Sequence, residues 1–304
     1  MQPLWYPGHT HAPAHPRVVA IGNFDGVHLG HQTVLRTAKQ AASERGLPLA
    51  VTTFDPAPTA VLAPERHQPR ICTLSDRIAL LHAVGVDLGS GGAFTPAFAA
   101  ISAENFGRDL LVRQLMTRVL VVGHDFRFGQ GRQGNAERLR GWCPELEVRE
   151  VEALSQDGVV SSSRIRKLVA AGKVEEAGRL LGRPHWLRGL VVQGDQRGRT
   201  LGFPTANLQT EVELLPAFGV YATRVEVDGL LHPAVTNIGL RPTFSGKHVS
   251  VESHLLDFQG DLYGKALRVE LVARIREEQK FASLDALVAQ IRSDVATARE
   301  RLWS

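Results

Sequence analysis

The sequence predicts an α/β domain followed by a small antiparallel β-barrel, and three features of the chain support this fold class. Up to about residue 181, apolar strand patterns alternate with helix patterns, as in a mostly parallel sheet covered by helices. Beyond Gly182-Arg183-Pro184, short runs with a period of two replace that alternation. One amphipathic helix closes the chain. We therefore predict two domains, 1–182 and 183–304.

The first half contains three strand patterns and several helix patterns. Strands are expected at 18–21, 49–54 and 119–122. Helices are expected after the first strand, at 75–84 with Ser75 as its N-cap, at 103–115, and as a hairpin at 162–181 interrupted at Gly172. The helix after the first strand has an apolar face made of Val34, Leu35, Ala38 and Ala41.

The second half of the sequence predicts a barrel with a terminal helix. Five period-two runs are expected to form strands: 187–192, 221–227, 231–236, 249–256 and 267–272. Asp228-Gly229 between two of them is a strong type I′ hairpin signal. Several such strands suggest a small barrel. Ser283 should cap the last helix, and we expect its apolar stripe to pack on the barrel: Leu284, Leu287, Val288, Ile291 and Val295.

Composition narrows the class of protein. The 304 residues carry 35 basic and 31 acidic side chains, a net charge of +4 without any Lys/Arg block. This small excess fits an enzyme that handles phosphate anions better than a nucleic-acid binder. An aromatic content of 6% also argues against the stacking platforms of nucleic-acid-binding proteins. We therefore expect no nucleic-acid partner.

We expect a cytoplasmic protein without a membrane partner. No run approaches the roughly 20 apolar residues of a membrane span, and the N-terminus lacks the pattern of a secretory leader. Cys72 and Cys143 are too few for a disulfide framework and are expected to be buried thiols. The sequence does not indicate an oligomeric state.

The segment Gly22-Asn23-Phe24-Asp25-Gly26-Val27-His28-Leu29-Gly30-His31 lies between a strand and a helix. At a helix start, unpaired N–H groups and the macrodipole favour an anion, and Gly30 would let a phosphate approach the backbone. His28 and His31 can add donors. The segment is neither a Walker loop nor a GxGxxG fingerprint.

Three further segments of the first half support a phosphate site. Residues 54–58 and 123–134 also follow strand ends, so we expect them to meet residues 22–31 in one cleft. Ser161-Ser162-Ser163-Arg164-Ile165-Arg166 stands at a predicted helix start and combines hydroxyls with guanidinium groups, which suit a phosphate chain.

The His28-Leu29-Gly30-His31 element resembles the HxGH signature of the nucleotidyltransferase superfamily, whose domain is Rossmann-like. The longer GNFDGVHLGHQ resembles the N-terminal domain of the bacterial bifunctional riboflavin kinase/FAD synthetase family. The resemblance implies that His28, His31 and Asn23 act on the triphosphate during catalysis. It also implies a nucleotide-binding loop that includes Gly22, Phe24, Asp25 and Gly30.

Three other segments extend this resemblance. Thr53-Phe54-Asp55-Pro56-Ala57-Pro58 is similar to a TFxPHP loop, with Ala57 in place of histidine. Residues 122–134 are similar to a GxDFRFGxxRxG segment that shapes the flavin side, which implies flavin contacts by Asp125, Phe126 and Phe128; alternatively, both phenylalanines are core residues. Residues 161–166 resemble an ISSTxIR motif, which implies that Ser162, Ser163, Arg164 and Arg166 hold phosphates.

A second signature, Gly194 to Asn207, stands in the predicted barrel. Thr205 and Asn207 place two oxygens on one side of an extended segment, and hard oxygen ligands suit Mg²⁺. Alone, the segment could be only a loop between strands. It resembles the PTAN motif of flavokinases, which implies that Thr205 and Asn207 bind the Mg²⁺ of ATP. Gly194, Gly198 and Arg199 would then cover the phosphates.

Glu252 is the expected base of a kinase. Phosphorylating an alcohol requires a group that accepts the hydroxyl proton, and a carboxylate within hydrogen-bond reach does this. The flavokinase resemblance continues through residues 219–222, 237–244, 251–258 and 276–281, and it implies that Glu252 is the catalytic glutamate. The alternative is a strand glutamate that faces solvent.

Together the two resemblances imply an enzyme that converts riboflavin to FMN and then FMN to FAD, with ATP and Mg²⁺ in both steps. One alternative is mainly a riboflavin kinase whose first domain is impaired, because Ala57 departs from the loop pattern. Another is a flavin-sensing protein without catalysis, which the intact set of His28, His31, Thr205, Asn207 and Glu252 disfavours.

Overall fold

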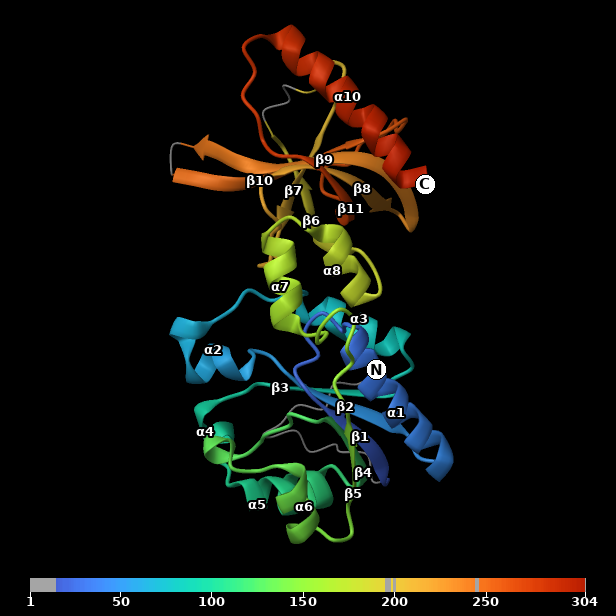
Figure 1. Ribbon diagram of the computed structural model, residues 1–304, viewed down its shortest axis with the longest axis vertical. Helices are drawn as coiled ribbons and strands as arrows, with labels where there is room; N and C mark the ends of the chain where they lie inside the picture. The colour runs from blue at the N-terminus through green and yellow to red at the C-terminus, as the bar shows by residue number, and fades with distance from the viewer. Residues whose placement is uncertain (1–14, 195–197, 199–200, 244–245, 304) are drawn as a thin grey trace. The chain divides into compact units, whose positions relative to one another are not determined.

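The computed structural model describes residues 15–194, 198, 201–243 and 246–303, and the chain divides into two compact units between Ser161 and Ser162 (Figure 1). This division lies ahead of the domain boundary we predict after residue 182. The reason is that the helical hairpin is grouped with the barrel: Val174, which begins its second helix, is part of the hydrophobic cluster of the barrel. Each unit is described by itself below.

The first unit is built on a five-stranded sheet with the order β3-β2-β1-β4-β5, in which every neighbouring pair is parallel. Its strands are β1 (Arg17–Ile21), β2 (Leu49–Phe54), β3 (Leu88–Gly92), β4 (Thr117–Gly123) and β5 (Glu147–Val151). The predicted parallel α/β architecture is confirmed. The two edge strands, β3 and β5, were not among the predicted strands.

Helices cover both faces of this sheet. They are α1 (Leu29–Arg45), α2 (Pro58–Leu62), α3 (Leu74–Ala83), α4 (Pro96–Ala99), α5 (Ala103–Asn105), a π-helix (Phe106–Gln114) and α6 (Ala136–Trp142). The predicted apolar face of α1 is buried as expected. The predicted N-cap of α3 was wrong: Thr73, not Ser75, accepts the N–H of Asp76 through Oγ1 at 3.2 Å.

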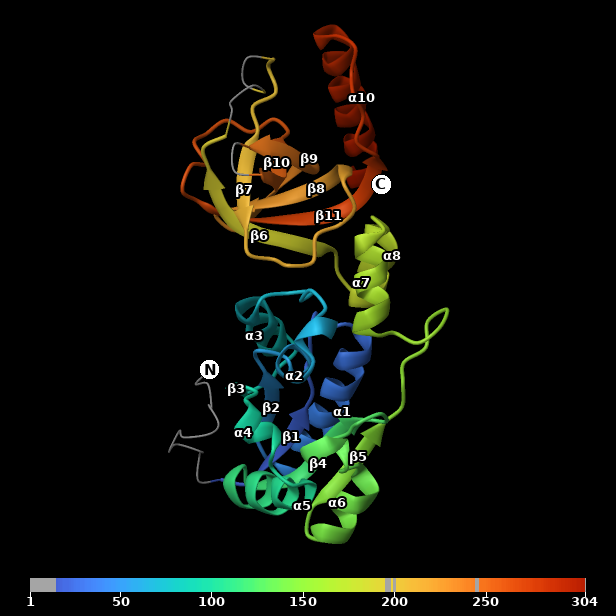
Figure 2. The ribbon, with the colours of Figure 1, turned by 90° about the vertical axis from the view of Figure 1, so that its left-hand side faces the viewer.

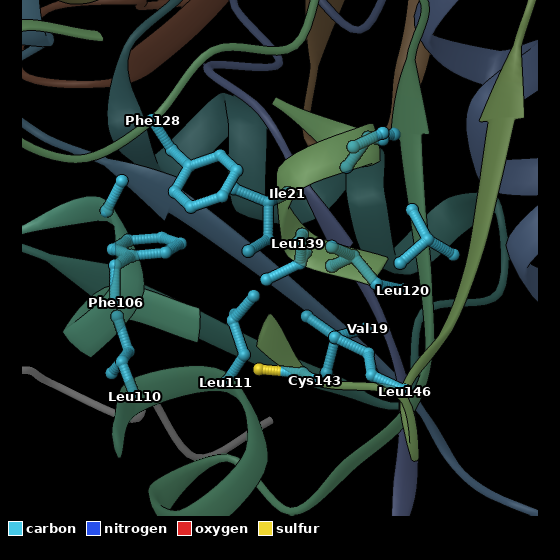
Figure 3. Packing of buried hydrophobic residues seen from close by; sticks show 14 of the residues in the cluster. Val19, Ile21, Phe106, Leu110, Leu111, Leu120, Phe128, Leu139, Cys143 and Leu146 are labelled. Carbon is cyan, nitrogen blue, oxygen red and sulfur yellow. The ribbon is translucent and has the colours of Figure 1, made fainter. Parts of the chain in front are cut away.

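Alternating strand residues feed two separate cores, one on each face. Val18 and Ala20 pack with α1 and α3, whereas Val19 and Ile21 pack with the π-helix and α6. Figure 3 shows the second core, where the sulfur of Cys143 points among the apolar side chains. Burial raises the pKa of the Cys143 thiol above its usual range. Both cysteines are free and buried, as predicted.

The second unit begins with α7 (Ser162–Ala170) and α8 (Val174–Leu181) and continues into a closed six-stranded barrel in the order β10-β7-β6-β11-β8-β9. Its strands are β6 (His185–Val192), β7 (Ala206–Thr210), β8 (Gly219–Val227), β9 (Leu230–Thr243), β10 (Gly246–Leu255) and β11 (Ala266–Arg276). Every neighbouring pair is antiparallel. The φ angles of Asp228 (51°) and Gly229 (84°) are those that a type I′ hairpin turn requires.

The terminal helix α10 (Leu284–Trp303) lies against β8, β9 and β11 (Figure 2). Ser283 caps it as predicted, accepting the N–H of Ala286 at 3.2 Å. The predicted packing stripe was wrong at its first residue, because Leu284 is 63% exposed. The helix is instead anchored through its second half, where Ala298 and Leu302 are buried against the barrel. In the described part of the chain, no helix combines the length and apolarity that a membrane span requires.

Candidate functional sites

The turn between β1 and α1 is the first candidate site. It follows the carboxyl end of the central strand, where parallel sheets bind their ligands. His28 is the N-cap of α1, and its Nδ1 accepts the N–H of His31 at 3.3 Å. Because Nδ1 is an acceptor, the proton of a neutral His28 ring lies on Nε2. Nε2–H is thus the donor that this ring can offer to a ligand.

The side chains of His28 and His31 contact each other. Their rings are stacked, with centroids 3.6 Å apart and an angle of 17° between the planes. Gly30 allows this stacking, since a β-carbon there would lie 3.2 Å from the ring of His28 and 3.3 Å from the carbonyl oxygen of Val160. The segment that leads to the serine-rich motif therefore passes close to this turn.

Three other residues of the turn differ in their exposure. The side chain of Asn23 is exposed, and Phe24 is 1% exposed with its ring 5.2 Å from that of His31. The carboxylate of Asp25 is also buried and accepts the backbone N–H groups of Ile71, at 3.1 Å, and Cys72, at 3.3 Å. Phe24 and Asp25 thus have clear structural contacts, whereas Asn23 presents its amide to solvent.

The loop after β2 contains Ala57, the residue that departs from the TFxPHP pattern. Ala57 is the N-cap of α2 and provides no side-chain hydrogen bond to that helix. Asp55 of the same loop forms an ion pair with Arg70 at 3.3 Å. A histidine donor is therefore missing at position 57.

The predicted flavin side follows β4. The rings of Phe126 and Phe128 are stacked, with centroids 5.1 Å apart, and the ring of Phe106 lies 5.0 Å from that of Phe128. Phe128 is 6% exposed and belongs to the core shown in Figure 3, whereas Phe126 is half-buried. Asp125 is exposed. Phe128 therefore supports the exposed end of this segment, and Asp125 and Phe126 are the side chains available to a ligand.

The serine-rich motif opens α7, the first element of the second unit. Ser163 is exposed, and Ser162, Arg164 and Arg166 are half-buried. Ile165 between the two arginines is fully buried. The hydroxyls and guanidinium groups of the motif thus share one helix start, as the sequence predicts.

The second candidate site lies on neighbouring strands of the barrel. Glu252 of β10 pairs directly with Asn207 of β7 on one side and with Asn237 of β9 on the other. Directly paired residues project from the same face of a sheet, with β-carbons about 5 Å apart. A carboxylate therefore stands between two amides on this face. Asn237 was not among the predicted site residues, because strand register cannot be read from one motif.

The glycines of the second signature pack against the two predicted metal ligands. A β-carbon on Gly194 would lie 2.4 Å from Nδ2 of Asn207, and one on Gly198 would lie 2.4 Å from the carbonyl oxygen of Phe203 and 3.5 Å from Oγ1 of Thr205. Glycine is thus required for this close approach. Arg199, also predicted here, lies outside the described residues.

A cavity of about 610 Å³ opens beside this segment. Thr205, Asn207 and Ser253 contribute polar groups to its wall, and Leu255, Phe258 and Tyr263 contribute apolar ones. The volume lies within the range of small-ligand sites. The mixture of oxygens and apolar side chains suits a ligand that has both a polar chain and a ring.

The donors of this site also fit Mg²⁺. Among the described residues there is no cluster of three or more His, Cys, Asp or Glu side chains that could hold a metal ion alone. Mg²⁺ in nucleotide sites needs less than that, because phosphates and waters supply most of its ligands. The hydroxyl of Thr205 and the amide oxygen of Asn207 are the hard donors that such a site requires.

The chain thus combines a parallel α/β unit and a closed antiparallel barrel, each with a candidate site rich in polar groups. The FAD synthetase family model matches residues 10–164, and the riboflavin kinase family model matches residues 181–302. The chain belongs to the bifunctional riboflavin kinase/FMN adenylyltransferase family, which confirms the predicted resemblance.

Individual relatives support this assignment over nearly the full length. The bifunctional riboflavin kinase/FMN adenylyltransferase of Escherichia coli (strain K12) is 42% identical over 96% of this chain and 94% of its own. The Bacillus subtilis (strain 168) protein of that name is 40% identical over 91% and 90%. A crystal structure named as a macrolide-efflux protein from Streptococcus pneumoniae has a TM-score of 0.88 at 36% identity, covering 94% of this chain and 95% of its own.

Proposed function

We propose that this chain phosphorylates riboflavin to FMN with ATP and adenylylates FMN to FAD with a second ATP. Both family models and relatives at about 40% identity over most of the chain support the two activities. The observation that carries the proposal is that each unit has its own set of reactive groups. These are the stacked histidines at the start of α1 and the carboxylate of Glu252 between two asparagines.

In the adenylyl transfer, a phosphate oxygen of FMN attacks the α-phosphorus of ATP, and the bond from that phosphorus to pyrophosphate breaks. The nucleophile is already anionic, so the protein needs to position the reactants and stabilise charge. We assign His28, through Nε2–H, and His31 to the triphosphate, together with the exposed amide of Asn23. The phosphate-binding role that the motif implies for Ser162, Ser163, Arg164 and Arg166 stays a prediction, because these residues open the second unit.

The other residues of the first site fall into those that shape the loop and those that contact the flavin, and their burial distinguishes the two groups. Phe24 and Asp25 act by holding the loop, because both are buried and Asp25 is bonded to backbone N–H groups. Gly22 and Gly30 act by giving space for neighbouring rings. Asp125 and Phe126 contact the flavin, and Phe128 supports them from the core.

In the kinase reaction, the oxygen of the ribityl hydroxyl attacks the γ-phosphorus of ATP, and the bond from that phosphorus to the ADP oxygen breaks. Glu252 accepts the proton of the hydroxyl. Thr205 and Asn207 would hold Mg²⁺, which neutralises phosphate charge when bound. Gly194 and Gly198 cover the phosphates, and the same role for Arg199, which lies outside the described residues, stays a prediction of the motif. The 610 Å³ cavity beside Thr205 and Asn207 supplies the apolar surface for the flavin ring.

The direct test measures the two half-reactions of the wild-type chain separately. Riboflavin with MgATP should give FMN, and FMN with MgATP should give FAD and pyrophosphate. Kinase activity without FAD formation would support the alternative in which Ala57 leaves the first site impaired. Flavin binding without either reaction would support a flavin sensor and contradict the proposal.

Three further assignments stay predictions. These are the functional boundary after residue 182, a cytoplasmic location, and the absence of a nucleic-acid partner. The matched family segments end at 164 and begin at 181, so the boundary concerns α7 and α8. Whether FAD formation requires these two helices can be tested by comparing the fragments 1–161 and 1–182, of which only the second contains α7 and α8.

A further inference from the structure

The turn that carries the two histidines has an unusual backbone. Phe24 (φ 46°) and Val27 (φ 41°) lie in the left-handed region, which is uncommon for any residue with a side chain and rarer still for a β-branched one. Such a conformation persists only when the surrounding structure holds it in place. The groups that hold this turn therefore affect where His28 and His31 lie.

A hydrogen-bonded chain reaches the turn from α3. Arg77 is 1% exposed, and its Nη1 donates to Oγ1 of Thr53 at 3.2 Å and to the carbonyl oxygen of Phe54 at 3.0 Å. Oγ1 of Thr53 in turn donates to the carbonyl oxygen of Asn23 at 2.9 Å. Because the guanidinium occupies a lone pair of the hydroxyl, the hydroxyl proton is directed to Asn23.

The last bond of this chain acts on the strained residue. The carbonyl of Asn23 belongs to the peptide plane whose orientation defines φ of Phe24. Phe24 is 1% exposed, and its ring meets the ring of His31 edge to face at 5.2 Å. The series of contacts thus runs without a break from Arg77, through Thr53, Asn23 and Phe24, to His31.

The partners of Arg77 are those hydrogen bonds. None of the ion pairs formed by the described residues includes an acidic partner of Arg77, and Nε of Arg77 has no hydrogen-bond partner among those residues. An arginine kept in the interior to neutralise a carboxylate would have such a partner. Arg77 instead donates to the hydroxyl of Thr53 and to the backbone carbonyl of Phe54, at the sheet edge where the candidate site lies.

We propose that Arg77 and Thr53 are positioning residues of the adenylyl-transfer site. They fix the backbone of Asn23 and Phe24 and thereby the place of His31. The inference rests on the proposed FMN adenylyltransferase function and adds two residues to it that contact no substrate. It predicts that the hydroxyl at position 53, rather than the bulk of the side chain, sets the rate of FAD formation.

The test compares Thr53→Val with Thr53→Ser in the full chain. Valine keeps the shape and removes both hydrogen bonds, and we expect kcat for FAD formation to fall about tenfold or more with little change in KM for ATP. Serine keeps the hydroxyl, and we expect kcat to stay within about threefold of wild type. Riboflavin kinase rates should be unchanged in both variants, and far-UV circular dichroism and the thermal unfolding of the chain should match wild type, which shows that the first unit is folded as well as the barrel.

Thr117→Val is the matched control. Thr117 is a buried threonine of the same sheet, and its Oγ1 has no hydrogen-bond partner among the described residues. Removing that hydroxyl should leave FAD formation unchanged. If Thr53→Val keeps wild-type kcat, or if Thr53→Ser loses as much as Thr53→Val, the proposal is overturned.

Arg77→Met supplies the second test, through a double-mutant cycle with Thr53→Val. If the two side chains act in one series, the double variant should lose no more kcat than the worse single variant. A loss of kcat in the double variant equal to the product of the two single losses would contradict the proposal. Wild-type FAD formation is measured first, because its absence would contradict the proposed function rather than the role of Thr53 and Arg77.

Discussion

His28 caps a helix, and the proposed function also gives it a role in the chemistry. One ring nitrogen caps the helix by accepting the N–H of His31, and the same bond leaves the proton on the other nitrogen. The ring stacks on that of His31, and this arrangement needs the space that Gly30 leaves. The geometry of a single glycine therefore determines where a donor is presented.

Gly30→Ala should disturb this donor without harming the helix. The new β-carbon would lie 3.2 Å from the ring of His28, so the ring must move by a few tenths of an ångström. Because alanine favours a helix over glycine by about 1 kcal/mol, stability should not fall. We expect FAD formation to slow about tenfold, since small misplacements of reacting groups are costly.

Gly141→Ala is the control for that variant. Gly141 also lies in a helix, α6, and a β-carbon there would meet nothing within 4 Å. The two variants can be compared by steady-state FAD formation and by thermal unfolding. Equal rates for both would show that the space above Gly30 is not what positions His28.

At the scale of elements, α10 is held by a polar anchor as well as by apolar contacts. Arg276 at the end of β11 and Asp294 of α10 form a two-pronged ion pair, with Nε–Oδ1 at 2.9 Å and Nη2–Oδ2 at 2.8 Å. The two side chains are 16% and 4% exposed. Gln290 adds a bond to the same carboxylate at 2.9 Å. This anchor holds the middle of the helix.

Asp294→Ala should therefore lower the free energy of unfolding of the barrel unit by about 3–5 kcal/mol, because it leaves a largely buried guanidinium without its partner. Urea unfolding followed by tryptophan fluorescence would measure this, since Trp186 and Trp303 lie in that unit. Arg292→Ala, an exposed change on the same helix, should stay within about 0.5 kcal/mol of wild type. A similar small effect for Asp294→Ala would contradict the anchoring role.

Patterns with a strong period predicted the elements best. The buried face of α1 and the alternating strands of the barrel were confirmed, because apolar periodicity records burial directly. β3, with the sequence LGSGG, has no such period, and β5 carries three charged residues in five, so neither stood out as a strand. The prediction that Leu284 packs on the barrel was wrong, because the position of α10 depends on the ion pair of Asp294 as well as on apolar contacts.

The candidate sites were predicted from local motifs, and what the sequence alone did not reveal is non-local. Thr53 and Arg77 are joined to the turn by hydrogen bonds between residues 30 and 24 positions apart in the sequence. Asn237 joins Glu252 only through the register of two strands. No motif records such pairings, because they arise only when distant segments of the chain fold together.

At the scale of the whole molecule, two compact units each have their own core and their own reactive groups. The central claim is that one chain carries two chemically independent sites for consecutive reactions on a flavin. If the sites are independent, damage to one should leave the rate at the other unchanged. This claim does not depend on how the two units are arranged.

Reciprocal variants in the two half-reactions test this claim most directly. His31→Ala should slow FAD formation from FMN by about 10²- to 10³-fold through loss of charge stabilisation, with riboflavin phosphorylation unchanged. Glu252→Gln should slow riboflavin phosphorylation by about 10²- to 10⁴-fold, with FAD formation from supplied FMN unchanged. Equal losses in both reactions from either variant would contradict two independent sites.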